Sequence, residues 1–281
     1  MCFEPYPLKY KGAKLHLQGM TIPVPCGKCP KCTKARINSW LFRLTIHARK
    51  YPYPLFITLT YDDKHLPVHS KSGRVSLDKS DPQKWFKRLR KSLDGQMDLS
   101  YFLVGEYGTK RKRPHYHVLL YGLPHNKSEL IYKTWGLGFT MTLPVLDGGM
   151  RYVLKYMAKP RSNYTSKLPE FSLMSKNIGA NYLTPQMIRY HLEDPAHTFA
   201  SLGNGIKLAL PKYYKEKIFG IDTPERKRVT DYLQKRAEMA QNSYLRRLSL
   251  NNRCLSQEEI IKLAFLRQHS LSYDKRLQES F

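Results

Sequence analysis

Two apolar runs that lie close together restrict the fold of this chain more than any other feature. Tyr101–Tyr107 and His115–Tyr121 are rich in β-branched and aromatic residues, and the polar, basic segment 108–114 separates them. Two such runs joined by a short polar segment predict a β-hairpin with a basic loop. The chain is therefore expected to contain an antiparallel sheet.

Helices and strands alternate on both sides of this hairpin. Apolar residues at helical spacing predict a helix over 33–50, and the β-branched run 55–61 predicts a strand. Asp81 can cap another helix, and Pro82 suits its first turn. The remaining expected elements are a short helix near 126–135, a strand near 138–145, and a helix from about 150 that Pro160 ends. This order predicts an α+β fold, with a mainly antiparallel central sheet flanked by helices.

The organisation along the chain divides into four stretches. Residues 1–50 hold a Cys-rich segment and the first helix, and residues 51–160 form the α+β core. Residues 161–221 are rich in Ser, Asn, Pro and Gly and are expected to be an irregular extension packed on that core. Residues 222–281 are highly charged and predict a helical, basic C-terminal region.

The charge of the chain bears on its partner. The formal net charge is +26, and such an excess is costly as self-repulsion unless a polyanion shares the surface. An anionic membrane or a nucleic acid would serve, and the 20 tyrosines favour nucleic acid because aromatic rings stack on bases. A basic surface that serves only solubility is the alternative. The candidate DNA contacts in the hairpin loop are Lys110, Arg111, Lys112 and Arg113.

The hydrophobic pattern bears on location. No run approaches the roughly 18 consecutive apolar residues of a membrane span, and the first residues lack a signal-peptide core. A soluble intracellular protein with no membrane partner is therefore expected. Because no P-loop is present, no nucleotide cofactor is expected either.

Two histidines of the hairpin form a candidate metal site. His115 and His117 lie two residues apart in the second strand, so both imidazoles are expected on one face of the sheet. Glu106 lies near the end of the first strand, from which its carboxylate can reach the same face. Two imidazoles and a carboxylate suit Mg²⁺ or Mn²⁺ with positions open for phosphate oxygens. Half-exposed histidines without a metal are the alternative.

The helix expected from about 150 carries a pair of tyrosines. Tyr152 and Tyr156 lie one turn apart, opposite an apolar stripe, and each is followed three residues later by a lysine, Lys155 and Lys159. A tyrosine hydroxyl is a poor nucleophile at its free pKa of ~10, but a phosphate polarised by a metal and screened by ammonium groups lowers the demand on it. Interfacial tyrosines with solvated lysines are the alternative.

Three cysteines form a separate cluster. Cys26, Cys29 and Cys32 are spaced so that their thiolates can converge on one structural zinc ion, and closely spaced cysteines in an intracellular chain indicate a metal rather than disulfides. The candidates for a fourth ligand are Cys2, His16 and His47. Reduced free thiols are the second interpretation. An iron–sulfur cluster is the third, although the ferredoxin pattern needs a cysteine where Arg36 stands.

Together these motifs resemble those of HUH endonucleases, which initiate rolling-circle DNA replication. The resemblance rests on three segments: the strand Phe56–Tyr61, Glu106 with His115-Tyr116-His117, and Tyr152-x-x-Lys155-Tyr156-x-x-Lys159. The two-tyrosine version is that of single-stranded DNA phages. The residues similar to the replication initiators of small icosahedral microviruses, especially gokushoviruses, are the three cysteines, Gly105-Glu106-Tyr107-Gly108, Arg113-Pro114-His115-Tyr116-His117 and Leu210-Pro211-Lys212-Tyr213-Tyr214. The match runs from about residue 24 to 219.

The resemblance implies a site-specific endonuclease and ligase for single-stranded DNA, with residues 51–160 as its catalytic core. Glu106, His115 and His117 would hold Mg²⁺ or Mn²⁺. Tyr152 and Tyr156 would alternate as nucleophiles, leaving a 5′-phosphotyrosine and a free 3′-OH, while Lys155 or Lys159 offsets charge on the phosphate. The enzyme would start and end rolling-circle replication of a circular phage genome.

The implied partners are single-stranded DNA, the replicative-form origin, and a helicase and DNA polymerase of the bacterial host, in whose cytoplasm the protein would act. Two other functions stay open from the sequence. One is a non-catalytic, zinc-containing nucleic-acid-binding protein, in which the two histidines are structural. The other is an HUH transposase or relaxase.

Overall fold

The computed structural model describes residues 6–9, 21–27, 29–51, 53–108, 110–145, 150, 153–154, 166–203, 205–252, 255–256, 259–260 and 263. The chain divides into two compact units. One is Trp40–Tyr182, and the other combines Met1–Ser39 with Leu183–Phe281. None of the described helices is long and apolar enough to cross a membrane.

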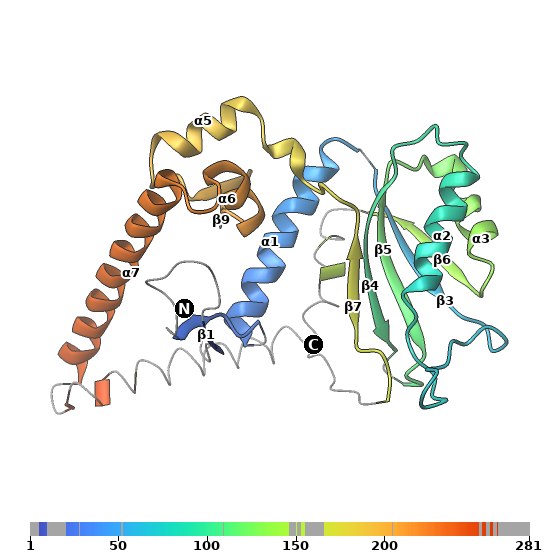
Figure 1. The fold of residues 1–281 in the computed structure, drawn as a ribbon, viewed down its shortest axis with the longest axis horizontal. Helices are drawn as coiled ribbons and strands as arrows, with labels where there is room; N and C mark the ends of the chain where they lie inside the picture. The colour runs from blue at the N-terminus through green and yellow to red at the C-terminus, as the bar shows by residue number, and fades with distance from the viewer. Residues whose placement is uncertain are drawn as a thin grey trace. The chain divides into compact units, whose positions relative to one another are not determined.

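The unit Trp40–Tyr182 is built on an antiparallel sheet (Figure 1). Its described strands are β3 (Leu55–Thr60), β4 (Ser100–Tyr107), β5 (Pro114–Tyr121), β6 (Thr140–Pro144) and β7 (Phe171–Met174). Their spatial order is β6-β3-β5-β4-β7, and every neighbouring pair is antiparallel. The predicted α+β fold with an antiparallel central sheet is confirmed. The hairpin β4–β5 is also confirmed, and β5 lies at the centre of the sheet.

Helices α2 (Ser80–Lys91) and α3 (Glu129–Trp135) lie on one side of this sheet (Figure 1). Their apolar side chains, among them Trp85 and Ile131, join inward residues of β3 and β5 in one hydrophobic core. The expected cap of α2 is wrong: α2 begins at Ser80, and the Asp81 carboxylate accepts a hydrogen bond of 2.8 Å from the Tyr61 hydroxyl. Asp81 therefore contributes to the buried polar contacts beneath the sheet.

Tyr116, between the two histidines, fixes the register of β5. Its side chain is fully buried in the core below the sheet, and its hydroxyl lies 2.8 Å from that of Tyr61. The same hydroxyl donates to the backbone carbonyl of Asp78 at 2.7 Å. A shift of one residue would bury the histidines instead and would leave this hydroxyl without its partners. The packing of Tyr116 thus directs His115 and His117 to the opposite face.

That opposite face is covered in part by α1 (Pro30–Ala48). The Trp40 ring lies 4.8 Å from the ring of Phe102, which is on the same face of β4 as Glu106. Near the end of α1, His47 is buried, and its Nε2 lies 2.6 Å from the Ser100 hydroxyl. The predicted first helix is confirmed, although it begins at Pro30 and so includes Cys32.

The expectation of irregular chain over 161–221 is wrong wherever the structure describes this stretch. Phe171–Met174 completes the central sheet as β7, beyond which follow a 3₁₀ turn η3 (Ala180–Tyr182), α5 (Pro185–Glu193), β8 (Phe199–Gly203), β9 (Ile206–Ala209) and α6 (Lys212–Phe219). Polar residues and prolines that looked like loop residues instead begin helices. Thr184 caps α5 by accepting a hydrogen bond from the Met187 amide, and Pro185 occupies its first turn. The boundaries expected at residues 50, 160 and 221 remain predictions.

The remaining described elements are β1 (Tyr6–Lys9), β2 (Thr21–Val24), the 3₁₀ turn η2 (His125–Lys127) and α7 (Pro224–Asn251). α7 agrees with the predicted charged helix, and Thr223 caps it in the same way as Thr184 caps α5.

Candidate metal and DNA site

Glu106 and His117 form a buried pair on the face of the sheet opposite α2 and α3. Glu106 lies directly across from His115 in the β4–β5 register, and His117 lies across from Val104. This diagonal placement brings the His117 Nε2 to 3.0 Å from the Glu106 Oε1, with each residue 6% exposed. Diagonal neighbours in a sheet are within reach when their side chains are long. The expected crossing of the carboxylate to the imidazole face is therefore present.

Two residues of β3 orient the His117 ring. Thr58 pairs with His117 in the β3–β5 register, and its hydroxyl lies 3.3 Å from the His117 Nδ1. The Phe56 ring stacks on the imidazole with 5.7 Å between centroids. No local sequence pattern indicates either contact, because the pairing of β3 with β5 depends on the sheet order.

His115 is half-buried and is held differently. Its Nδ1 lies 2.7 Å from the Arg113 carbonyl oxygen, so Nδ1 carries the proton and donates it. The Nε2 of a neutral His115 is then a lone-pair nitrogen, which is how metal-binding histidines are usually arranged. Gly108 lies beside this ring: a Cβ there would come within 3.1 Å of the His115 Cε1. The close approach of chain and ring accounts for a glycine at this position.

The structure brings Glu106 and His117 together but does not converge all three predicted metal ligands. In the described part of the chain, the sulfur atoms of Cys26, Cys29 and Cys32 are the one group of three or more potential ligand atoms that all lie within 4.8 Å of one another. The hydrogen bond between Glu106 and His117 occupies the atoms that would face an ion.

Glu170 is a further acidic residue at this site, and no sequence motif pointed to it. Gly105 of β4 pairs with Phe171 of β7, so the residue before Phe171 comes next to Glu106. Phe171 packs into the core on the other face, and alternation along the strand directs Glu170 to the face of Glu106. The Glu170 Oε2 is buried and has no hydrogen-bond partner among the described residues. Recognising β7 as a strand would have revealed this residue.

The predicted nucleophiles and their lysines, Tyr152, Tyr156, Lys155 and Lys159, lie outside the described residues. In the same segment, Val153 and Leu154 are helical and completely buried, as the predicted apolar stripe requires. The Thr45 hydroxyl of α1 lies 3.6 Å from the sulfur of Met150.

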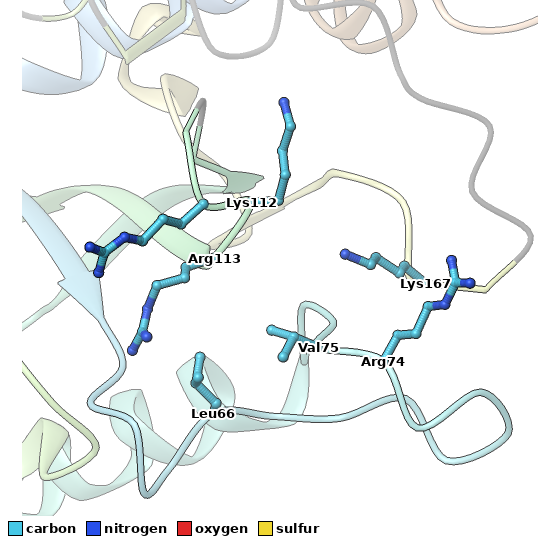
Figure 2. Close-up of a pocket in the computed structure, with 7 residues that line it drawn as sticks. Leu66, Arg74, Val75, Lys112, Arg113 and Lys167 are labelled. Carbon is cyan, nitrogen blue, oxygen red and sulfur yellow. The ribbon is translucent and has the colours of Figure 1, made fainter.

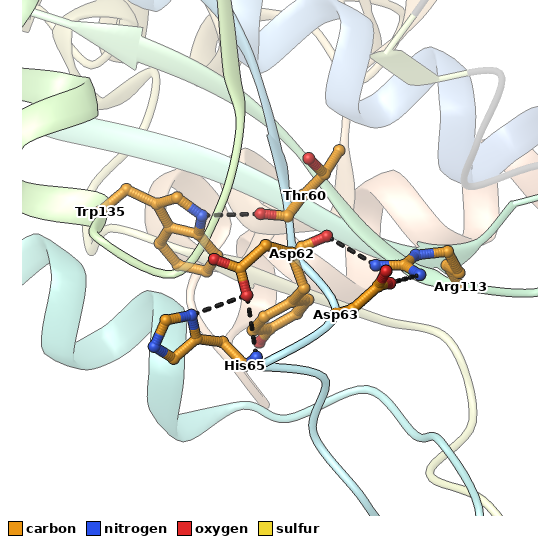
Figure 3. A network of polar contacts seen from close by, with 7 residues as sticks. Thr60, Asp62, Asp63, His65, Arg113 and Trp135 are labelled. Carbon is orange, nitrogen blue, oxygen red and sulfur yellow. Dashed lines mark hydrogen bonds and ion pairs between the residues drawn. The ribbon is translucent and has the colours of Figure 1, made fainter.

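Of the four predicted DNA contacts in the hairpin loop, Arg113 is anchored within the protein. Its guanidinium pairs with the Asp63 carboxylate and donates to the Tyr61 carbonyl at 2.8 Å (Figure 3). Two further contacts near the end of β3 hold the same region: Trp135 donates to the Thr60 carbonyl, and the Asp62 carboxylate accepts from His65 (Figure 3). Lys110, Arg111 and Lys112 are exposed. Arg113 therefore fixes the base of the loop, and the other three cations face solvent.

The cysteine cluster belongs to the other unit. Cys29 is buried, and its amide donates to the Cys26 sulfur at 3.2 Å. Amide bonds of this kind favour the thiolate form, which is the form that binds metal. His47 is excluded as the fourth ligand: its Nε2 contacts Ser100, and its Nδ1 accepts from the Gly179 amide at 3.3 Å. Cys2 and His16 lie outside the described residues.

Comparisons with known proteins match this core. A family model described as replication-associated protein ORF2 matches residues 54–161, which contain both strands of the histidine hairpin. The replication-associated protein ORF2 of Spiroplasma virus 4 is 31% identical over 218 residues, which cover 69% of this chain and 67% of that protein. The chain belongs to the family of phage replication-associated proteins.

Two further relatives of this replication-associated family match the chain. The replication-associated protein ORF4 of Chlamydia phage 1 is 25% identical over 240 residues, or 75% of this chain and 57% of that protein. The replication-associated protein VP4 of Bdellovibrio phage phiMH2K is 26% identical over 229 residues, or 74% of this chain and 71% of that protein. No solved structure gives a significant match.

Proposed function

We propose that this protein is a metal-dependent endonuclease and ligase for single-stranded DNA that initiates and terminates rolling-circle replication of a circular phage genome. The observation that carries the proposal is the buried pair Glu106–His117 beside His115, within the segment that matches the replication-associated family. Structural histidines alone would not require a carboxylate buried on the same face, because burying an ionised carboxylate is costly without a strong partner.

The residues on this face fit a divalent cation. His115 has its Nδ1 committed to a backbone carbonyl, and Glu170 has a buried carboxylate oxygen without a hydrogen-bond partner in the described part of the chain. Glu106, His115 and His117 would hold Mg²⁺ or Mn²⁺, with Glu170 beside them, once the Glu106–His117 hydrogen bond opens. The ion would polarise the scissile phosphate and stabilise the departing 3′ oxygen.

The reaction itself needs two nucleophiles, which we assign to Tyr152 and Tyr156. The oxygen of one tyrosine attacks the scissile phosphorus and loses its proton, while the bond from phosphorus to the 3′ oxygen breaks and that oxygen becomes a 3′-OH. The 5′-phosphotyrosine retains the energy of the bond, so a later attack by a 3′-OH rejoins the strand without a nucleotide cofactor. Lys155 and Lys159 would offset the charge that develops on the phosphate.

The partners of this reaction would be single-stranded DNA and the replicative-form origin. Because the chain offers no nucleotide-binding motif, strand separation and synthesis would fall to a helicase and DNA polymerase of the host, and the site of action would be the bacterial cytoplasm. The relatives are named for replication, which favours this function over a transposase or relaxase.

A covalent-adduct assay tests the proposal. The protein is incubated with single-stranded DNA carrying a 3′-side label and the phage origin, with Mn²⁺ or with a chelator. We expect a labelled protein band that resists denaturation and forms only with the metal. A protein that binds this DNA tightly but forms no adduct with any divalent ion would instead be a non-catalytic, zinc-containing binding protein.

A further inference from the structure

A basic cavity lies next to the hairpin loop, in the unit Trp40–Tyr182. Three separate segments build it (Figure 2). They are the connection between β3 and α2, the β4–β5 loop, and the segment before β7, which contribute Leu66, Arg74, Val75, Arg111, Lys112, Arg113 and Lys167. Its volume is about 480 Å³, which is large enough for part of a nucleotide chain.

The walls of the cavity are held in place by contacts between these segments. Ser72 donates its hydroxyl to the Ser166 carbonyl at 2.5 Å, and the Arg74 guanidinium lies 3.4 Å from the Ser166 hydroxyl. The Lys167 ammonium lies 5.2 Å from the centre of the Tyr107 ring. Arg113 is anchored to the end of β3 by its contact with the Tyr61 carbonyl. The cavity is thus a built feature of the fold and does not depend on one loop alone.

The charges that line the cavity are all of one sign. Five of the seven lining residues are Arg or Lys, and none is acidic. Figure 2 shows Lys112 and Arg113 on one side of the opening, Arg74 and Lys167 on the other, and Leu66 and Val75 between them. Cations on two facing walls repel one another unless an anion lies between them. An extended ligand with a charge at each repeat would contact both walls at once.

We propose that this cavity binds the phosphodiester backbone of single-stranded DNA, a few nucleotides away from the scissile phosphate. The inference rests on the proposed function. Arg113 is two residues from His115, so the same short segment contributes to the cavity and to the candidate metal site. The apolar side chains of Leu66 and Val75 would contact a sugar or base, while the cations contact phosphates. Two of the cations, Arg74 and Lys167, belong to no sequence motif.

Removing the two cations of the wall opposite the hairpin tests this site. In the full chain, the Arg74→Ala/Lys167→Ala variant is compared with Lys84→Ala/Lys87→Ala, which removes the same charge from the exposed side of α2. The probe is a fluorescent oligothymidylate, titrated without divalent metal at several salt concentrations.

We expect the cavity variant to bind about tenfold more weakly near 0.1 M salt, and its salt slope to fall by about 1.4 units for two lost phosphate contacts. The α2 variant should stay within about twofold of the unaltered protein. A second variant, Arg74→Gln/Lys167→Gln, keeps polar side chains on the wall and should reproduce the loss; matching thermal melts exclude misfolding.

Two results would overturn the inference: unchanged affinity and slope in both cavity variants, or an equal loss in the α2 variant, which would mean a diffuse electrostatic field. Because binding is measured without metal, the result is independent of cleavage. A protein that forms no covalent adduct but loses DNA affinity in the cavity variants would contradict the proposed nuclease and retain the binding site.

Discussion

The Nε2 of His117 lies 3.0 Å from the Oε1 of Glu106, across two antiparallel strands, with both residues 6% exposed. This contact joins β4 and β5 at the end of the sheet where the basic loop begins. A buried imidazole and carboxylate satisfy each other when no ion is bound, and the same two atoms become ligands when one is. Access of a metal to this pair is therefore central to the proposed chemistry.

The first prediction concerns this pair. His117→Ala should abolish cleavage and adduct formation but leave the affinity for single-stranded DNA within about twofold, because most of that affinity comes from Lys and Arg contacts to phosphate. The matched control is His65→Ala, since His65 contacts Asp62 away from the site. Gel analysis of adducts and salt-dependent binding check both expectations. Normal cleavage by His117→Ala in the presence of a chelator would refute the metal site.

Glu170 carries a second prediction. Glu170→Gln should weaken Mn²⁺ binding about 10-fold or more, as substitutions next to metal ligands commonly do. Its melting temperature without metal should not fall, because the lost carboxylate oxygen has no hydrogen-bond partner among the residues that the structure describes. Mn²⁺ titration followed by electron paramagnetic resonance measures the affinity, with the exposed Glu193→Gln as control. A lower melting temperature with unchanged Mn²⁺ affinity would make Glu170 a purely structural residue.

A third prediction concerns the two tyrosines. Tyr152→Phe and Tyr156→Phe should each retain part of the cleavage, because two hydroxyls one helical turn apart can both reach one phosphate with a modest tilt. The double variant should form no covalent adduct. Peptide mapping of the adduct identifies the attacking residue, and full adduct formation by the double variant would exclude both tyrosines as nucleophiles.

The fourth prediction is that the cysteine cluster contributes to folding. Cys29→Ser should release zinc and lower the melting temperature, because metal binding adds free energy that the unfolded chain cannot gain. Protein that remains folded should keep its dependence on Mn²⁺ or Mg²⁺ for nicking. Elemental analysis of protein purified without added metal is the direct measurement. Absence of zinc and iron, with an unchanged melting temperature in Cys29→Ser, would show that these residues carry no metal.

The fifth prediction concerns pH. Burial, reinforced by the nearby positive charge of Lys50, lowers the pKa of His47 from 6.5 to about 4. The unfolded chain therefore binds this proton more readily, so the stabilising contribution is complete above pH 6.5 and declines as the pH falls towards 4. The decline should amount to about 1.4 kcal/mol per pH unit at most.

Urea unfolding at pH 7 and pH 5 tests this effect. The free energy of unfolding should fall between these pH values by about 2 kcal/mol more in the unaltered protein than in His47→Gln, which has no group to titrate at this position. An equal fall in both proteins would mean that other groups cause the acid sensitivity.

The hairpin and its histidines could be predicted from sequence because the information is local. Alternation along a strand places His115 and His117 on one face whatever the strand pairs with, and the buried Tyr116 on the other. The positions of the helices α1, α2 and α3 followed in the same way from the spacing of apolar residues. The fold class and the candidate ligands were therefore determined by the sequence itself.

Tertiary structure alone decided which residues from distant segments meet at the site. Thr58 reaches His117 because β3 pairs with β5, and Glu170 reaches the face of Glu106 because β7 adds to the far side of β4. Arg74 and Lys167 meet the hairpin only through the cavity walls. Sheet order and loop packing depend on the burial of the whole core, since each strand pairs where its apolar face is covered. No pattern within a single segment contains that information.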